Sequence, residues 1–200
     1  MKFDYVIIGA GSAGCVLANR LSENQNNKVA VFEAGGSSDI WKVKMPLALL
    51  YTMHDPKYNW KYYSEPEPHL NNRRIFCPRG KMIGGCSSHN GMVFVRGNRN
   101  DYERWENFGL KSWSYEKILP YFKKIENWSG GESQYRGSFG PLPVNQSKND
   151  NPLFKAFISS ASEAGHEVNP DMNGENQEGF GMFDTTIHNG ERASTTKYYL

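Results

Sequence analysis

Hydrophobic positions in the first 33 residues follow two different patterns. Residues 6–8 and 29–32 are continuous apolar runs, as strands of a buried parallel sheet require. Between these runs, apolar side chains recur at the spacing of one helix face. They are Ala13, Val16, Leu17, Ala18 and Leu21. The pattern therefore predicts strand, helix and strand over residues 3–33.

A glycine motif joins the first predicted strand to the helix, and an acidic residue ends the second strand. Gly9, Gly11 and Gly14 have the spacing G-x-G-x-x-G, and Glu33 follows about 20 residues on. The first glycine permits a sharp turn, the second lets backbone approach a pyrophosphate, and the third lets helix and sheet pack closely. The N–H groups that open the helix favour phosphate. Glu33 can bind a ribose diol but would repel a 2′-phosphate, which leaves NAD and FAD as candidates.

Later segments are less regular. Residues 35–75 are rich in Trp, Tyr, Pro and His, and such a long excursion is typical of a functional loop or lid. We expect a helix after Ser114, kinked or shifted by Pro120, and a second helix that begins at Asn151-Pro152 and ends at Gly165. The polar stretch at 130–150 predicts a connector. A strand is expected within residues 180–187.

Length, charge and cysteine content narrow the class of protein. The 200 residues allow one or two domains, and a net charge of +2 gives no reason to expect a nucleic-acid partner. Three cysteines without close pairing do not form a disulfide or zinc pattern. No stretch has the length and apolarity of a transmembrane span, and a strand beginning by residue 3 leaves no room for a cleavable signal. We therefore expect a cytoplasmic protein with reduced thiols.

Residues 79–97 form a second glycine-rich block. Gly84 and Gly85 allow backbone to approach a ligand closely, and the short polar side chains that follow could contact phosphates or a flavin ring. Cys86 has no identifiable base beside it and is interpreted as a small buried residue. The other histidines lack metal-ligand spacing, so no metal site is predicted. They are His54, His69, His166 and His188.

The whole chain resembles the N-terminal part of a glucose–methanol–choline (GMC) oxidoreductase. The first glycine motif, residues 32–35 and the 79–97 block are in family order and at family-like spacing. This resemblance implies an α/β fold: an incomplete Rossmann-like FAD-binding domain over residues 1–140, followed by the start of an α+β substrate-binding domain over residues 141–200. It also implies that residues 35–75 contain the loop that covers FAD.

The resemblance implies FAD as the cofactor, held by residues of both glycine-rich segments. The expected cofactor-binding residues are Gly9, Gly11, Ser12, Ala13, Gly14, Glu33, Ala34, Gly84, Gly85, Ser88, His89, Asn90, Gly91, Met92 and Val93. The sequence from Gly84 to Asn90 resembles the loop of the choline oxidase/choline dehydrogenase-like branch, in which a histidine carries the flavin covalently. His89 is therefore the candidate covalent attachment site. The alternative is that His89 only packs or hydrogen-bonds beside the flavin.

The implied reaction is oxidation of an alcohol to a carbonyl by hydride transfer to flavin. None of the five histidines maps onto the family's catalytic histidine, which would lie beyond Leu200. We therefore expect this chain to turn over poorly by itself, as an N-terminal portion that lacks the C-terminal part. The alternatives are a non-catalytic FAD-binding fragment or subunit that needs a partner chain, and an NAD-dependent enzyme, which the 79–97 block disfavours.

The substrate, the electron acceptor and the oligomeric state stay open. The resemblance favours a choline-like amino alcohol, and aliphatic or aromatic alcohols are alternatives. An aromatic cage for a quaternary ammonium could draw on side chains in the long excursion. The candidates are Trp41, Tyr51, Trp60, Tyr62 and Tyr63.

Overall fold

A computed structural model describes residues 2–200. The chain forms two compact units. The first comprises the residues up to Met92 together with Asn189–Leu200, and the second comprises Val93–His188. The predicted boundary between residues 140 and 141 separates the two domains that the family resemblance implies. It is a different division from these two compact units, and it stays a prediction.

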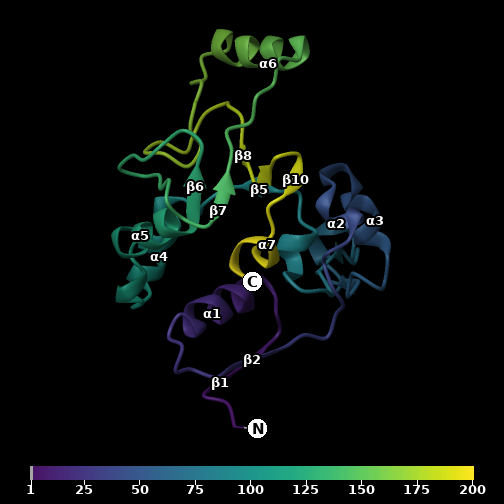
Figure 1. The fold of residues 1–200 in the computed structure, drawn as a ribbon. Helices are drawn as coiled ribbons and strands as arrows, with labels where there is room; N and C mark the ends of the chain where they lie inside the picture. Colours follow the sequence, from purple (N-terminus) through teal and green to yellow (C-terminus); the bar gives the residue numbers. More distant parts are fainter. Residues whose placement is uncertain (1) are drawn as a thin grey trace. The chain divides into compact units, whose positions relative to one another are not determined.

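The first unit begins with the βαβ arrangement that the hydrophobic pattern predicts. Strands β1 (Tyr5–Ile8) and β2 (Val29–Phe32) are parallel, in a register that pairs Tyr5 with Val29 and Ile8 with Phe32. Helix α1 (Ser12–Ser22) connects them and buries Gly14, Cys15 and Ala18 (Figure 1). The prediction of strand, helix and strand is therefore confirmed, and it places the glycine motif at the carboxyl end of β1.

The excursion after β2 folds into short elements, in keeping with its weak periodicity. A small core of Val43, Tyr58 and Met82, with Ile40 packed against it, holds these elements together. The elements of this segment and of the second glycine block are α2 (Trp41–Lys44), η1 (Pro46–Ala48), α3 (Leu49–His54), β3 (Tyr62–Tyr63), η2 (Pro68–Leu70), β4 (Phe76–Cys77) and η3 (Gly85–Ser88).

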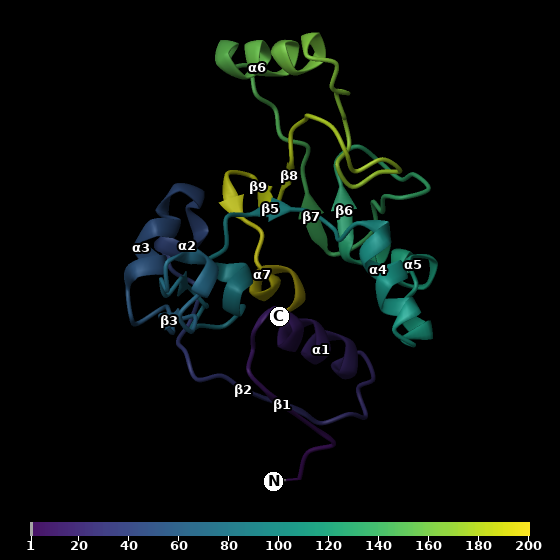
Figure 2. The same cartoon turned by 180° about the vertical axis from the view of Figure 1, so that it is seen from behind.

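The last twelve residues of the chain belong to the first unit, although Val93–His188, which precede them, form the second unit. They contain β10 (Glu191–Arg192) and α7 (Thr195–Tyr199). Helix α7 packs against α1, where the side-chain amide of Asn19 donates a hydrogen bond to the carbonyl oxygen of Tyr199 at 2.8 Å. Both views show the two helices side by side, in yellow and purple (Figures 1 and 2).

The second unit contains two strand pairs and three helices among its described elements. Strands β6 and β7 are parallel, and β5 and β8 are antiparallel (Figure 2). Its elements are β5 (Val93–Phe94), α4 (Arg99–Asn107), η4 (Lys111–Trp113), α5 (Tyr115–Ile125), β6 (Glu126–Trp128), β7 (Leu142–Val144), α6 (Pro152–Glu163), β8 (Asp184–Thr185) and β9 (Ile187–His188).

The helix and strand predictions for this unit have mixed outcomes. Helix α6 begins as expected: the Asn151 side chain accepts a hydrogen bond from the Leu153 N–H, with Pro152 in the first helical position. Helix α5 follows Ser114 but runs through Pro120, and the Ser114 side chain makes no capping bond. The strand expected within 180–187 is confirmed only in part: β8 lies inside this range, the chain is interrupted at Thr186, and β9 begins at Ile187.

The second unit contains a buried ion cluster. Glu126 and Arg136 are fully buried and joined at 3.1 Å, and Arg96 also pairs with Glu126. Arg136 reaches two further carboxylates, Asp171 at 2.5 Å and Asp184 at 2.7 Å. Because each charge has opposite charges beside it, the cluster is compensated rather than reactive. None of the described helices is long and apolar enough to cross a membrane.

Candidate cofactor site

The turn between β1 and α1 has the geometry that close packing of a strand and a helix requires. Gly9 has φ of +94°, and its N–H donates to the Phe32 carbonyl at 2.7 Å. A Cβ on Gly14 would lie 2.0 Å from the Gly9 carbonyl oxygen, so only glycine fits there. Gly11 is the N-cap of α1, and no side chain caps the helix. The N–H groups of its first turn are therefore available to an anion.

Glu33 is fixed at the end of β2 by two backbone amides. Its Oε2 accepts from the Ala10 N–H at 2.9 Å, and its Oε1 accepts from the Gly35 N–H at 2.8 Å. A carboxylate has about four lone-pair sites, so each oxygen keeps capacity for a further donor. The side chain is therefore held rigidly while it can still accept from a pair of hydroxyls.

A cavity of about 550 Å³ lies over this turn. Gly11 lines the cavity, and a Cβ built on it would meet no atom within 4 Å. The glycine thus leaves space that a ligand can fill. The residues that line the cavity are Ile8, Gly9, Gly11, Phe32, Glu33, Ala34, Trp60, Gly80 and Gly85.

The second glycine block packs directly on the first. The Gly84 N–H donates to the Ala10 carbonyl at 2.6 Å, and a Cβ on Gly85 would lie 2.8 Å from the Gly11 Cα. Ser12 Oγ also donates to the Gly84 carbonyl at 3.5 Å. Two segments about 70 residues apart in the sequence therefore form one continuous surface.

His89 lies within this block, directly after η3. Its side chain is 3% exposed, and its Nδ1 is buried without a hydrogen-bond partner among the described residues. Burial lowers the pKa of His89, and the positive charges of Arg192 and Arg79 lower it further. The imidazole is therefore held in its neutral form, in which one ring nitrogen has a free lone pair.

A second cavity, of about 510 Å³, borders His89. Cys86 lines it as well and is a free cysteine. The complete lining is Leu49, Met53, Pro78, Arg79, Cys86, His89, Asn90 and Gly91.

The other predicted cofactor residues have different surroundings. Ser88 is buried, and its hydroxyl donates to the Ile83 carbonyl at 2.9 Å, so it stabilises the loop. Met92 has φ of +59°, and its N–H donates to Asn90 Oδ1 at 3.1 Å. Ala13 lies in the first turn of α1. Val93 begins the second unit, where it pairs with Thr185 in the β5–β8 pair.

The aromatic side chains of the excursion do not form one cage. Trp41 contacts Tyr51 edge-on at 5.9 Å, and Trp60 stacks on Tyr62 at 6.0 Å. Of the five candidates, Trp60 lines the cavity at the β1–α1 turn, and the other four line neither of the two cavities. The expected quaternary-ammonium cage is therefore not assembled by these residues within the first unit.

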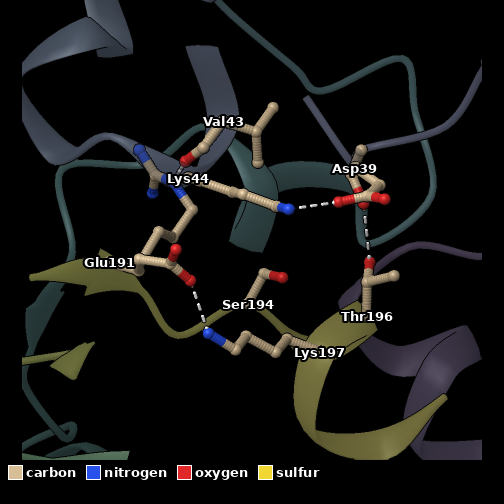
Figure 3. Close-up of a pocket in the computed structure, with 9 residues that line it drawn as sticks. Asp39, Val43, Lys44, Glu191, Ser194, Thr196 and Lys197 are labelled. Carbon is tan, nitrogen blue, oxygen red and sulfur yellow. Dashed lines mark hydrogen bonds and ion pairs between the residues drawn. The ribbon is translucent and has the colours of Figure 1, made fainter. Parts of the chain in front are cut away.

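One residue that the sequence analysis missed is Arg192. Its side chain is 3% exposed, and it donates to the Asn90 carbonyl at 2.8 Å and to Asn90 Oδ1 at 2.9 Å. It also borders a third cavity, of about 310 Å³, that is crossed by the ion pairs Lys44–Asp39 and Lys197–Glu191 (Figure 3). The arginine stands in a polar segment without a periodic pattern, so no sequence signal distinguishes it.

The residues present fit an adenine dinucleotide cofactor with a flavin end. Gly11 leaves open space at the helix N-terminus, Glu33 offers unused acceptors for a diol, and His89 Nδ1 is a buried polar atom without a partner. These three features lie on a single unit of the chain.

Comparison of the chain with family models and with known proteins points to one family of oxidoreductases. The family model described as GMC oxidoreductase matches residues 3–200. The chain is 52% identical to the oxygen-dependent choline dehydrogenase of Sinorhizobium fredii (strain NBRC 101917 / NGR234) over 200 residues, which are all of this chain and 36% of that protein. It is 50% identical to the oxygen-dependent choline dehydrogenase of Vibrio vulnificus (strain YJ016), with 99% of this chain and 36% of that protein covered. The chain thus spans about a third of the length of these relatives.

Two solved structures with the same fold are those of oxidases. Pyridoxine 4-oxidase from Mesorbium loti superposes with a TM-score of 0.92 at 30% identity, over 99% of this chain and 39% of that one. A formate oxidase from Aspergillus oryzae RIB40, described in connection with FAD modification, gives a TM-score of 0.86 at 27% identity, over 98% of this chain and 36% of that one. With a family model that spans nearly its whole length, this chain belongs to the GMC oxidoreductase family.

Proposed function

We propose that this chain is the FAD-binding N-terminal portion of an enzyme that oxidises an alcohol to a carbonyl. The observation that carries the proposal is the contact between the two glycine blocks, in which Gly84 donates to the Ala10 carbonyl. That contact makes one surface from the dinucleotide turn and the loop that ends at His89. FAD, when bound, would supply the acceptor for a hydride from the alcohol carbon.

The chain's own residues would hold the cofactor at its two ends. The N–H groups of the first turn of α1 would bind the pyrophosphate, and Glu33 would accept hydrogen bonds from the adenosine ribose. Asn90 and Gly91, which are exposed beside His89, would lie along the flavin.

We further propose that His89 is covalently attached to the flavin. The bond would join an imidazole nitrogen to the 8α carbon, with loss of one hydrogen from each. The two electrons released would have to leave through the flavin to an external acceptor such as dioxygen. Burial keeps the imidazole neutral and therefore nucleophilic, and its Nδ1 has no competing partner among the described residues.

Alcohol oxidation also needs a base that takes the hydroxyl proton as the C–H bond breaks. In this proposal no histidine of the chain has that role, and the chain by itself turns over poorly. The substrate class is a choline-like amino alcohol, which the identity of 50% or more to choline dehydrogenases supports.

The first experiment is to measure flavin absorbance of the purified chain before and after acid precipitation. Yellow colour that stays in the pellet supports covalent FAD. The His89→Ala variant should release its flavin into the supernatant, whereas His69→Ala, a change at an exposed histidine, should not. Flavin that stays acid-stable in His89→Ala would refute the attachment site, and absence of flavin from the wild-type chain would count against cofactor binding by this portion.

A second candidate function is a non-catalytic FAD-binding subunit that needs a partner chain. The observation that favours it is that the α1 turn, Glu33 and His89 all lie on one unit of the chain, which accounts for cofactor binding without a catalytic base. Addition of a separately expressed C-terminal segment of a homologous choline dehydrogenase distinguishes the two. If choline oxidation is restored, the result supports the proposal that the chain is the N-terminal portion of an enzyme. If the mixture binds FAD but stays inactive, the result supports the proposal of a non-catalytic FAD-binding subunit.

A further inference from the structure

Arg192 is a buried cation that lacks a carboxylate partner among the described residues. Its side chain is 3% exposed, and none of the ion pairs in the described part of the chain includes it. Burial lowers the pKa of Arg192 to about 10, so the guanidinium is still charged near neutral pH. An uncompensated buried charge is costly, which makes its retention informative.

The acidic side chains nearest to Arg192 in the third cavity are already occupied. Glu191 pairs with Lys197 at 2.6 Å, and Asp39 pairs with Lys44 at 2.5 Å. Figure 3 shows both pairs, with each carboxylate turned toward its lysine. The charge of Arg192 is therefore not neutralised from this side.

Arg192 instead donates its hydrogen bonds to backbone of two separate segments. Its Nε donates to the Val43 carbonyl at 3.0 Å, which ties it to α2. Its Nη1 donates to the Asn90 carbonyl at 2.8 Å, to Asn90 Oδ1 at 2.9 Å and to the Ser87 carbonyl at 3.5 Å. Both ends of the segment 87–90 are thus fastened, and His89 lies between them.

A second observation concerns buried polar atoms that have no hydrogen-bond partner in this arrangement. Arg192 Nη2 is buried without a hydrogen-bond partner in the described residues, and so is His89 Nδ1. Both residues belong to the first unit, and the charge of Arg192 acts on the His89 imidazole. Arg96 Nε and Trp128 Nε1 in the second unit are also without a partner among the described residues, so an unpartnered atom does not by itself mark a site. The two atoms in the first unit differ because they belong to residues that share the loop 87–90, which Arg192 holds through its hydrogen bonds.

We infer that Arg192 is a positioning residue for the flavin loop: it clamps residues 87–90 to α2, and so it fixes the His89 side chain, on which its positive charge acts, in the place where the cofactor would bind. This inference rests on the proposed function of His89. The clamp fixes where the imidazole lies, and the charge opposes its protonation. The charged groups that act on His89 are Arg192 and Arg79, and both disfavour a second positive charge.

Two variants separate the clamp from the charge. Arg192→Lys keeps a cation but replaces the planar fork with a single ammonium, so it cannot reproduce bonds to both Val43 and Asn90. Arg192→Met removes both the clamp and the charge while it keeps an apolar stem. Lys28→Met, which removes an exposed cation of the first unit that makes no ion pair among the described residues, is the matched control.

The decisive readout is the His89 pKa in the chain without cofactor, measured by NMR on protein labelled at the histidine ring carbons. The His89 signal is assigned by its loss in His89→Gln. We expect the His89 pKa to rise in Arg192→Met toward the ordinary value of 6.5, and to stay lowered in Arg192→Lys and Lys28→Met. A general loss of packing would move other histidine signals as well, which the same spectra report.

The second readout is the acid-stable fraction of flavin after incubation with FAD. We expect at least a 10-fold slower formation of acid-stable flavin in both Arg192 variants and no change in Lys28→Met. An unchanged His89 pKa in Arg192→Met, or wild-type attachment rates in both variants, would overturn the inference. If Arg192→Met does not fold, the attachment rate in Arg192→Lys decides. Wild-type protein without acid-stable flavin refutes covalent attachment, while the pKa comparison still tests Arg192.

Discussion

The Gly84 N–H donates a hydrogen bond to the carbonyl oxygen of Ala10 at 2.6 Å. This bond joins the two glycine-rich segments of the chain, and Gly85 then passes so close to Gly11 that a Cβ on Gly85 would lie 2.8 Å from the Gly11 Cα. The nucleotide turn and the proposed flavin loop are therefore parts of one surface. Changes on either side of this contact are expected to act on cofactor binding.

Gly11→Ala should weaken FAD binding without unfolding the chain. A Cβ at Gly11 meets no atom within 4 Å, but Gly11 lines the cavity in which the pyrophosphate is proposed to lie. We expect at least a 10-fold loss of FAD affinity, about 1.4 kcal/mol, in a fluorescence titration. Gly36→Ala is the control, because its Cβ also meets no atom within 4 Å and Gly36 does not line that cavity. Equal affinities in the two variants would contradict the assignment of the turn.

Gly14→Ala should behave differently from Gly11→Ala. A Cβ at Gly14 would lie 2.0 Å from the Gly9 carbonyl oxygen, which is backbone and cannot move without separating α1 from β1. We expect a loss of several kcal/mol in the free energy of unfolding, measured by urea denaturation. A stability equal to that of Gly11→Ala would show that the helix can shift.

Glu33→Gln should weaken FAD binding by about 10- to 100-fold, since hydrogen bonds to a charged acceptor contribute about 1.5–3 kcal/mol. The stability of the protein without cofactor should fall by only about 1 kcal/mol, because the amide NH₂ cannot accept from one of the two N–H groups that Glu33 now satisfies. Titration calorimetry with FAD and urea denaturation measure the two effects. Glu23→Gln, at an exposed residue that follows α1, should change neither.

The stability of the chain should depend on the protonation of His89. Because the folded-state pKa lies below the ordinary value of 6.5, the unfolded chain binds a proton more readily than the folded chain as the pH falls. The contribution is fully present above pH 6.5 and is lost as the pH falls through the folded-state pKa. Urea denaturation at several pH values should give a smaller decrease below pH 6.5 for His89→Gln than for the wild type. Parallel curves for the two proteins would refute this.

Glu126→Ala should strongly destabilise the second unit. The substitution removes the carboxylate that pairs with both Arg96 and Arg136, and both side chains are buried. Leaving a buried charge without its partner costs about 3–5 kcal/mol. Glu103→Ala breaks an exposed pair with Arg99 and should cost less than about 0.5 kcal/mol. The melting temperatures of the two variants, measured by thermal unfolding, test this prediction. Similar decreases in melting temperature would show that the buried ion cluster does not stabilise this unit.

The sequence by itself determined the elements whose signals are local. The βαβ unit follows from apolar runs and helical spacing within 33 residues, and the start of α6 follows from Asn151 and Pro152, because these patterns act through hydrogen bonds and packing between near neighbours. The motifs also identified the family that the comparisons then showed.

Only the tertiary structure decided which distant residues meet. Ala10 and Gly84 are 74 residues apart, and Asn90 and Arg192 are 102 residues apart. No local sequence pattern predicts either of these two hydrogen bonds, because each depends on how separate elements pack. The same holds for the aromatic residues, which composition allowed as a cage but which pack in separate pairs, and for the ion cluster, whose charges come from five separate positions in the second unit. The sequence states which side chain stands at each position, whereas the fold determines which side chains contact one another in a buried site.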